Sequence, residues 1–358
     1  MALFSRRSKT NAPAPKDSPE TVDVVDAADA EQVSAEETPS VNISMQTFRG
    51  VGAPAGATIS SKLPELNDTA APAPVKLPLA PANPPEQTES VPGMKDNVLL
   101  REALAQLGED PTNEELIGVL RQSLQGNLYL RVQGDAQEQL SAGQPLSIAI
   151  AREGEHQFML AFSSAAAVKA AVLLETDPLA TSAVVQPVRS IFQQVVDGPF
   201  AGVVLDTASA PQRAFFPSDL IKKALDQADS TFTLKTLLAT PRDASSEAQV
   251  GEALATARLW VAVSDADQDG QFGIAEAELG DGTRLLQIFS HPLEIVALGR
   301  GERPLPFTAE QMGSVLARHD RLDGVLIDPA GPSMIVRRDA LSSVIALAKP
   351  DAVAPDEA

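Results

Sequence analysis

Leu128-Tyr129-Leu130-Arg131-Val132 occurs twice in the chain, the second time in the altered form Leu259-Trp260-Val261-Ala262-Val263. The two stretches contain the only tyrosine and the only tryptophan of the 358 residues, at the same place in each. A short, mainly apolar run is typical of a buried β-strand. The repetition indicates that one strand occurs twice, as in a duplicated domain.

Two further pairs of stretches follow in the same order. Leu160-Ala161-Phe162-Ser163 is matched by Gln287-Ile288-Phe289-Ser290, and Gly202-Val203-Val204-Leu205-Asp206 is matched by Gly324-Val325-Leu326-Ile327-Asp328. Three matches in one order predict two tandem copies of the same unit. The shared positions are nearly all apolar, so we expect them to form the core and to carry little chemistry.

Each copy is predicted to be an α+β domain in which helices pack on a mixed sheet. Apolar periodicity, caps and turn residues place helices at 98–107, 114–124, 165–174, 187–196 and 220–228 and strands at 128–132, 146–150, 158–162, 201–205 and 214–216. The second copy repeats this scheme more compactly. We expect the first domain at residues 97–230, the second at 231–348 and a frayed tail at 349–358.

Residues 1–95 differ from the rest in composition. Alanine, proline and acidic residues dominate, and 13 of the 28 prolines lie there. Such a stretch buries too little apolar surface to offset the entropy lost on ordering, so we expect a disordered arm. One apolar island, residues 43–51, interrupts it and has two interpretations: a docking segment for a partner, or a chance cluster.

The charge of the chain excludes some partners. It has 28 lysines and arginines against 48 aspartates and glutamates, a net charge of −20. A field of that sign repels phosphate backbones and anionic lipids, so we expect neither a nucleic acid nor a membrane partner. Without cysteine there is no disulfide framework and no thiolate site. No apolar run has the length of a signal peptide core or a spanning helix, and we expect a cytoplasmic protein.

The loop after the second copy of the aromatic strand matches the formula of a calcium-binding EF-hand loop. Its ligands would be Asp265, Asp267 and Asp269, the carbonyl of Gln271, and Glu276, with Gly270 at the sharp turn. The context favours another interpretation, because a strand precedes the loop where an EF-hand has a helix, and no second such loop follows. The alternative is a solvated acidic hairpin tip.

No arrangement of residues indicates a catalytic site. The three histidines, His156, His291 and His319, lie at a strand start, at a helix cap and beside Asp320. There is no Gly-x-Ser-x-Gly elbow to supply a nucleophile. Tyr129 and Trp260 are better explained as core residues than as a pair that stacks on a ligand.

The order of aromatic strand, Phe-Ser helix cap, Gly-Val-x-x-Asp-Pro turn and late helix resembles the N-terminal domain of the bacterial SseB family. The best match is the stretch 324–332, although the family usually has Asn where this chain has Asp328. The resemblance spans roughly residues 97–348 and implies no established catalytic activity. We therefore expect a non-enzymatic, cytoplasmic protein-interaction module without a cofactor. The alternatives are a calcium-responsive protein and a hydrolase whose pocket contains His291 or His319 beside a serine or carboxylate.

Overall fold

The computed structural model describes residues 77–174, 181–209, 212–264 and 273–348. The apolar island at 43–51 lies outside them. Within the described residues, no helix is long and apolar enough to cross a membrane.

The first unit contains six strands and six helices among its described residues. In chain order they are α1 (Val98–Ala105), α2 (Asn113–Ser123), β1 (Asn127–Gln133), α3 (Ala136–Ser141), β2 (Ile150–Glu153), β3 (His156–Phe162), α4 (Ala165–Val172), β4 (Thr181–Pro187), α5 (Val188–Asp197), β5 (Phe200–Leu205), β6 (Ala214–Pro217) and α6 (Ser218–Gln227). The sheet order is β4-β1-β3-β5-β6, with β2 paired to β3. Because β3 and β5 are parallel and the other pairs antiparallel, the sheet is mixed, as predicted.

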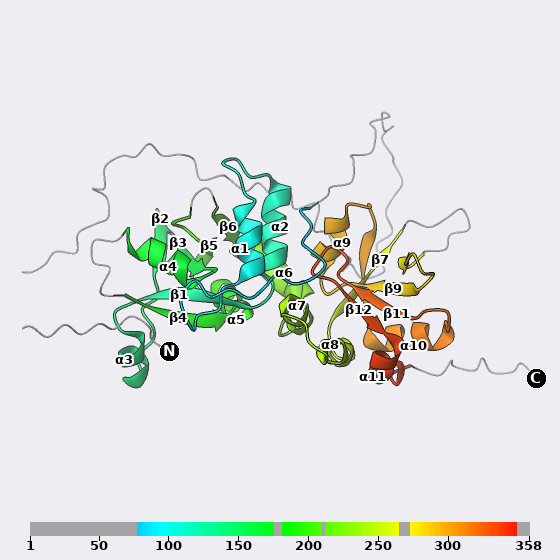
Figure 1. Cartoon of the computed structure of the whole chain (residues 1–358). Coiled ribbons are helices and arrows are strands. Elements are labelled where there is room, and N and C mark those ends of the chain that lie inside the picture. Colours follow the sequence, from blue (N-terminus) through cyan, green and yellow to red (C-terminus); the bar gives the residue numbers. More distant parts are fainter. Residues whose placement is uncertain (1–76, 175–180, 210–211, 265–272, 349–358) are drawn as a thin grey trace, which may run out of the picture.

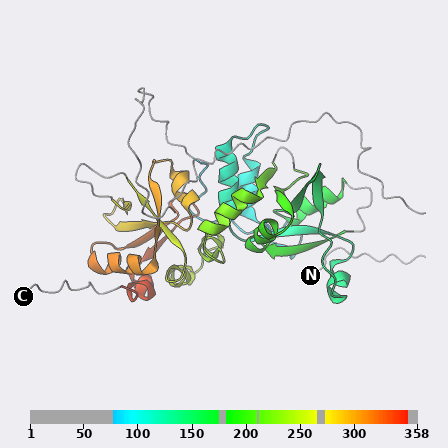
Figure 2. The same cartoon turned by 180° about the vertical axis from the view of Figure 1, so that it is seen from behind.

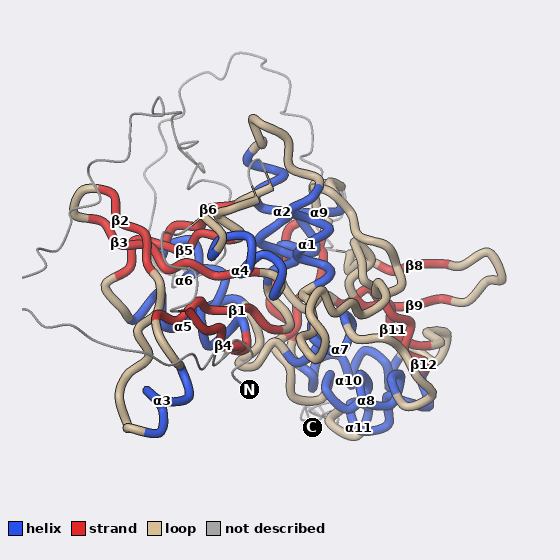
Figure 3. The backbone as a smooth tube through the Cα atoms, turned by 60° about the vertical axis from the view of Figure 1, so that its left-hand side comes forward, coloured by secondary structure: helices blue, strands red, loops and turns tan. Residues whose placement is uncertain are grey.

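The second unit follows the linking helix α7 (Thr233–Ala239). Its elements are α8 (Ser246–Leu254), β7 (Leu259–Val263), β8 (Glu276–Glu278), β9 (Arg284–Ile288), α9 (Pro292–Leu298), β10 (Arg303–Phe307), α10 (Ala309–Arg318), β11 (Gly324–Ile327), β12 (Met334–Arg337), the 3₁₀ helix η1 (Arg338–Leu341) and α11 (Ser342–Ile345). Figure 1 shows the two α+β units side by side with α2 and α7 between them, and Figure 2 shows the same arrangement from behind. Figure 3 shows α8, α10 and α11 gathered on one side of the second unit.

The two sheets have the same topology. Strand β10 pairs with β7, and β12-β11-β9-β8 form the rest. Trp260 and Phe289 exchange two backbone hydrogen bonds of 2.9 Å, which join both parts into the order β10-β7-β9-β11-β12. In the first sheet Tyr129 lies opposite Phe162 in the same way. The duplication seen in the sequence is therefore a duplication of the whole fold.

The repeated aromatic and glycine residues have structural roles. Tyr129 and Trp260 are both buried, and each donates one hydrogen bond to a backbone carbonyl, of Lys95 at 2.7 Å and of Gln227 at 3.0 Å. At Gly202 a Cβ atom would lie 2.3 Å from a carbonyl oxygen of β6, and at Gly324 2.2 Å from one of β12. The interpretation of the aromatic pair as core residues is confirmed.

Each sheet is covered on both faces. In the first unit α1, α2, α5 and α6 pack on one face, and α4 packs on the other around Tyr129 and Phe162. In the second unit α8, α10 and α11 pack on the equivalent face of the sheet. Helix α9 packs on the other face, around Trp260 and Phe289. The helices α4 and α9 are thus equivalent, and each lies on the sheet face that carries the repeated aromatic residues.

The segment 77–97, which we name the strap, departs from the predicted disordered arm. Its first part bonds to the second unit: Ala80 N–H donates to Ala330 O, and Ala82 O accepts from Ser333 N–H, both at 2.9 Å. Its last part packs on the first unit, where Met94 is buried beside α4. The proline content misled the prediction here, because the polar groups of the strap find partners on other segments.

Candidate functional site

A cluster of buried charges lies where the two units meet. Glu294 on α9 accepts a hydrogen bond from Arg121 Nη1 on α2 at 2.8 Å and a second from Lys235 Nζ on α7. The side chains of Glu294, Arg121 and Lys235 are 0%, 1% and 7% exposed. One carboxylate therefore bridges the first unit, the linker and the second unit. The apolar side of the same helix adds to the junction, because Leu293 and Ala297 are buried in the core of the first unit.

Arg121 makes further contacts that extend this junction. Its Nη2 donates to Pro78 O of the strap at 2.8 Å, and its Nη1 donates to Gly331 O at 3.0 Å. Its Nε has no hydrogen-bond partner among the described atoms. The guanidinium group thus binds the strap, α9 and the turn after β11 at once, and its planar geometry suits several simultaneous acceptors.

The charges of this cluster depend on one another. Burial alone would raise the pKa of Glu294, but Arg121 and Lys235 together outweigh it and hold that pKa below its usual range. Withdrawing charges from water is costly, and removing one partner leaves an uncompensated charge. The cluster therefore favours the one arrangement of the two units in which all three groups meet.

His291 lies next to the cluster, at the N-cap of α9. Its Nδ1 accepts from Leu293 N–H, and its Nε2 lies 3.1 Å from Ala224 O, so we assign the ring proton to Nε2. Complete burial, followed by the charge of Lys235, lowers the pKa of His291 to about 4. Both ring nitrogens have backbone partners, so this imidazole is a capping group, as the sequence indicated.

A serine and an aspartate form a buried pair in each copy. In the second copy Asp328 accepts from the backbone N–H of Ser290 at 2.8 Å and from its hydroxyl at 2.5 Å. Ser163 and Asp206 repeat both bonds at the same distances. The aspartates also share a left-handed backbone, with φ of +50° at Asp206 and +45° at Asp328. In the second copy the pair joins the end of β11 to the start of α9, the helix that follows the parallel strand β9. In the first copy it joins the end of β5 to the start of α4, which follows the parallel strand β3.

These aspartates are harder to ionise than free ones. Burial, and then the negative charge of Glu294, raises the pKa of Asp328 to about 7. Burial also raises the pKa of Asp206, while the two bonds from Ser163 act in the opposite direction. Sequence reasoning quoted all four residues but missed the pairs. The available signal was that a serine and an aspartate end two of the matched stretches.

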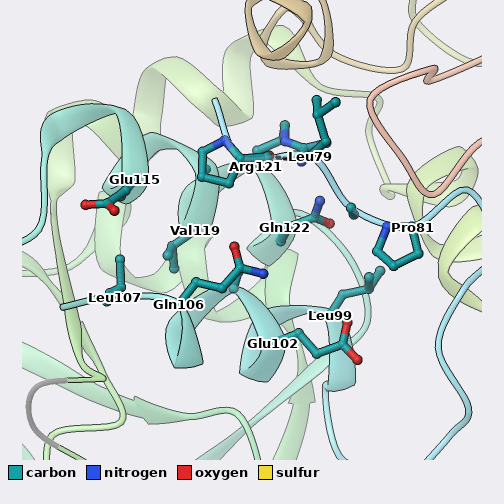
Figure 4. Close-up of a pocket in the computed structure, with 14 residues that line it drawn as sticks. Leu79, Pro81, Leu99, Glu102, Gln106, Leu107, Glu115, Val119, Arg121 and Gln122 are labelled. Carbon is teal, nitrogen blue, oxygen red and sulfur yellow. Dashed lines mark hydrogen bonds between the residues drawn. The ribbon is translucent and has the colours of Figure 1, made fainter. Parts of the chain in front are cut away.

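A small pocket lies between the strap and the helices α1 and α2, beside Arg121 (Figure 4). Its volume is about 160 Å³, and its lining includes Glu102, Gln106, Glu115 and Gln122. Sites for drug-sized ligands usually measure about 300–1,000 Å³, so this pocket suits water molecules better.

The pockets give no direct role to the histidines. Neither the small pocket nor a wider open depression of about 880 Å³ on the first unit is lined by a histidine. His156 begins β3, and His319 is the C-cap of α10. The hydrolase alternative required His291 or His319 in a pocket beside a serine or carboxylate, and neither described pocket supplies this.

Most of the predicted calcium ligands lie outside the described residues, namely Asp265, Asp267, Asp269 and Gln271. Glu276 is described: it begins β8, pairs with Leu286 and forms an ion pair with Arg284. No group of three acidic or histidine side chains suitable for a metal occurs among the residues that the structure describes. The calcium site stays a prediction.

Four exposed apolar side chains lie on the first unit, away from the junction. They are Leu140 of α3, Leu173 and Leu174 at the end of α4, and Val185 of β4, with exposed fractions of 60%, 68%, 78% and 50%. Both α3 and α4 contact β4. Val185 lies on the α4 face of the sheet, because Ala183 two residues earlier packs there. Leu140 is set apart from the others, because α3 bonds to the side chain of Ser182, which points to the opposite face of β4. We call Leu173, Leu174 and Val185 the β4 patch.

Comparison with known proteins agrees with the duplication. The family model described as the SseB protein N-terminal domain matches residues 100–222 and again residues 234–343. No curated protein and no solved structure gives a significant match. The two matched ranges cover more than half of the sequence and fall on the two α+β units. The chain therefore belongs to the SseB family, and it carries the N-terminal domain of that family twice in tandem.

Proposed function

We propose that this protein is a non-enzymatic protein-interaction module and that its partner binds the β4 patch. The observation that carries the proposal is the exposure of Leu173, Leu174 and Val185 on two elements that contact each other, α4 and β4. Isolated apolar side chains on a surface need no explanation, but a group of them on adjoining elements is typical of an interface.

The charge of the chain and its buried chemistry support the same proposal. A net charge of −20 disfavours nucleic acid and anionic membranes as partners, which leaves proteins as the favoured class. The polar clusters that resemble catalytic groups, at His291 and at the two Ser–Asp pairs, bond within the protein. The proposed function uses no cofactor and places the protein in the cytoplasm.

The test is affinity capture from the native host followed by mass spectrometry, with the full chain as bait. We expect the double substitution Leu173→Asp/Leu174→Asp to lose partners that the wild type captures, because it introduces two charges into the patch. Leu79→Asp is a suitable control, since Leu79 is 58% exposed and lies on the strap. An identical set of partners for the wild type and the double variant would refute the proposal.

A second bait separates the arm from the patch. The strap belongs to the folded structure from Leu77 onward, so a deletion that tests the arm has to stop before it. We would remove residues 1–70. If captured partners depend on the arm alone, this deletion loses them while the Leu173→Asp/Leu174→Asp variant keeps them, and the interface lies in the arm instead.

A further inference from the structure

The first part of the strap, residues 77–83, lies extended between the two units. On one side Arg121 Nη2 of α2 donates to Pro78 O at 2.8 Å. On the other side Ala80 and Ala82 each form a backbone hydrogen bond of 2.9 Å with the turn between β11 and β12. The bonded positions 78, 80 and 82 follow the period of two of an extended peptide. We name the space between α1, α2 and this turn the strap groove.

Two glycines allow the strap to approach both walls of the groove. At Gly118 of α2 a Cβ atom would lie 3.0 Å from the Cδ atom of Pro78. At Gly331 it would lie 2.2 Å from Ala80 O. Leu77, the residue before the proline, is only 3% exposed and belongs to the apolar core cluster of the first unit. The groove therefore accommodates an apolar residue followed by proline, whereas its hydrogen bonds reach the peptide backbone and accept many sequences.

The rest of this segment has few buried side chains. Leu79 is 58% exposed, and residues 81–83 are exposed as well. Arg242, which bonds to Ala82 O and to Asn83 Oδ1, is itself exposed. A segment with so little buried apolar surface leaves its site at a small cost in free energy. The strap thus resembles a bound peptide more than a part of the core, and the groove is able to accept another peptide in its place.

The strap does not fill its groove. The pocket of about 160 Å³ between the strap, α1 and α2 remains, and Pro81 borders it (Figure 4). Since a water molecule needs only about 10–15 Å³ of such space, the pocket is large enough for one long side chain. Besides Arg121, whose charge Glu294 balances, its polar lining consists of two carboxylates and two amides, namely Glu102, Glu115, Gln106 and Gln122. A basic side chain at the position of Pro81 therefore suits this pocket better than proline does.

We propose that the strap groove is a recognition site for an extended segment of a partner protein, in which an apolar residue precedes a proline and a basic residue follows three positions after it. The strap is the resident occupant, and the partner segment displaces it. The net charge of −20 attracts basic segments over a distance. This site goes beyond the proposed function, because it lies at the junction of the two units and not at the β4 patch.

Displacement of the strap is tested with the full chain and a fluorescent peptide of residues 77–85, whose binding is followed by fluorescence anisotropy. Ala80→Pro in the chain removes the N–H group that bonds to Ala330 O and so weakens the resident strap. Because a tethered occupant competes at an effective concentration of roughly millimolar, we expect this variant to bind the peptide at least tenfold more tightly than the wild type. Ala80 lies outside the apolar cores of both units, and circular dichroism verifies that the variant is folded.

Glu86→Ala is the control for this variant. Glu86 is exposed and lies on the strap beyond the part that binds in the groove, so we expect the affinity of the wild type. Equal affinities of the wild type and Ala80→Pro for the peptide, or no binding to either, would overturn the proposal.

Matched peptides test the side-chain requirement on the Ala80→Pro chain. We expect Leu77→Asp in the peptide to abolish binding, because this side chain is buried in the groove. Leu79→Asp is the same change at an exposed position, and we expect it to keep the affinity within about twofold. If both peptides bind equally well, the groove does not select an apolar residue before proline and the proposal is wrong.

A second pair of peptides tests the basic residue. We expect the peptide with Pro81→Lys to bind about threefold more tightly than the peptide with Pro81→Glu. Glu102→Gln in the chain, at an exposed position of α1, is expected to reduce this difference. Equal affinities of the lysine and glutamate peptides would contradict the proposed basic residue. None of these measurements involves the β4 patch or partner capture, so the strap groove and the proposed function fail separately.

Discussion

The helices α4 and α9 occupy the same place in the two copies, yet only α9 contributes a charge to the junction. Glu294 of α9 pairs with Arg121 and Lys235, and the same position in α4 is Ala167. The strap covers the start of α4, where Ala166 N–H donates to Ser90 Oγ at 3.1 Å. One copy therefore uses this helix to fix the junction, while the other leaves the far end of the helix exposed.

The edge strands of the two sheets also differ. Pro304 and Pro306 of β10 lie opposite Ala262 and Trp260, and the equivalent positions of β4 are Ala183 and Val185. The common fold is kept by apolar residues, so the copies differ mainly where a helix or an edge meets something outside its own domain. Substitutions at matched positions test that difference.

The largest effect is expected for Glu294→Gln. It removes the carboxylate that both Arg121 and Lys235 contact and leaves two buried cations uncompensated, so we expect a loss of about 3–5 kcal/mol in the free energy of unfolding. Urea denaturation followed by the fluorescence of Trp260, the single tryptophan, measures it. Asp226→Asn is the control, because its pair with Lys222 is exposed to solvent and we expect its removal to change the free energy of unfolding little. Equal losses for the two variants would show that the junction does not depend on Glu294.

The matched substitutions Ser290→Ala and Ser163→Ala rank next. Each removes the hydroxyl that donates to a buried aspartate, and we expect each to cost about 1–3 kcal/mol at pH 7. The same denaturation experiment measures both. A loss in only one copy would break the equivalence of the two pairs.

A pH series with Asp328→Asn gives a smaller effect. Because the pKa of Asp328 is raised to about 7 in the folded protein, its contribution to stability falls as the pH rises from about 4 to 7. Asparagine removes this dependence and tolerates a positive φ. We therefore expect the variant to match the wild type near pH 4 and to exceed its unfolding free energy by roughly 1–3 kcal/mol at pH 8.

The comparison between the variant and the wild type also separates Asp328 from His291. The lowered pKa of His291, about 4, reduces stability as the pH falls from about 6.5 to 4, and it does so in both proteins. Its effect therefore cancels in the difference between them. A difference that does not change with pH would contradict the raised pKa of Asp328.

Sequence reasoning predicted the duplicated strands because apolar runs with repeated aromatic residues leave a strong pattern. It missed β10, since Pro304 and Pro306 argue against a strand anywhere except at an edge. It also missed the Arg121–Glu294 pair, because those residues lie 173 positions apart and no local pattern connects them. The Ser–Asp pairs could have been predicted from the sequence, because the serines and aspartates are the polar members of otherwise apolar repeats.

The smallest effect is expected at the loop that distinguishes the copies most clearly in sequence. Glu276 lies in a strand and pairs with Arg284, so we expect Glu276→Ala to cost less than about 1 kcal/mol. The equivalent loop of the first copy contains α3 and lacks the acidic ligands. Calorimetry with millimolar Ca²⁺ is expected to give no binding heat for the wild type. Heat that disappears in both Asp265→Ala and Glu276→Ala would instead establish the calcium-responsive alternative and make this loop the functional difference between the two copies.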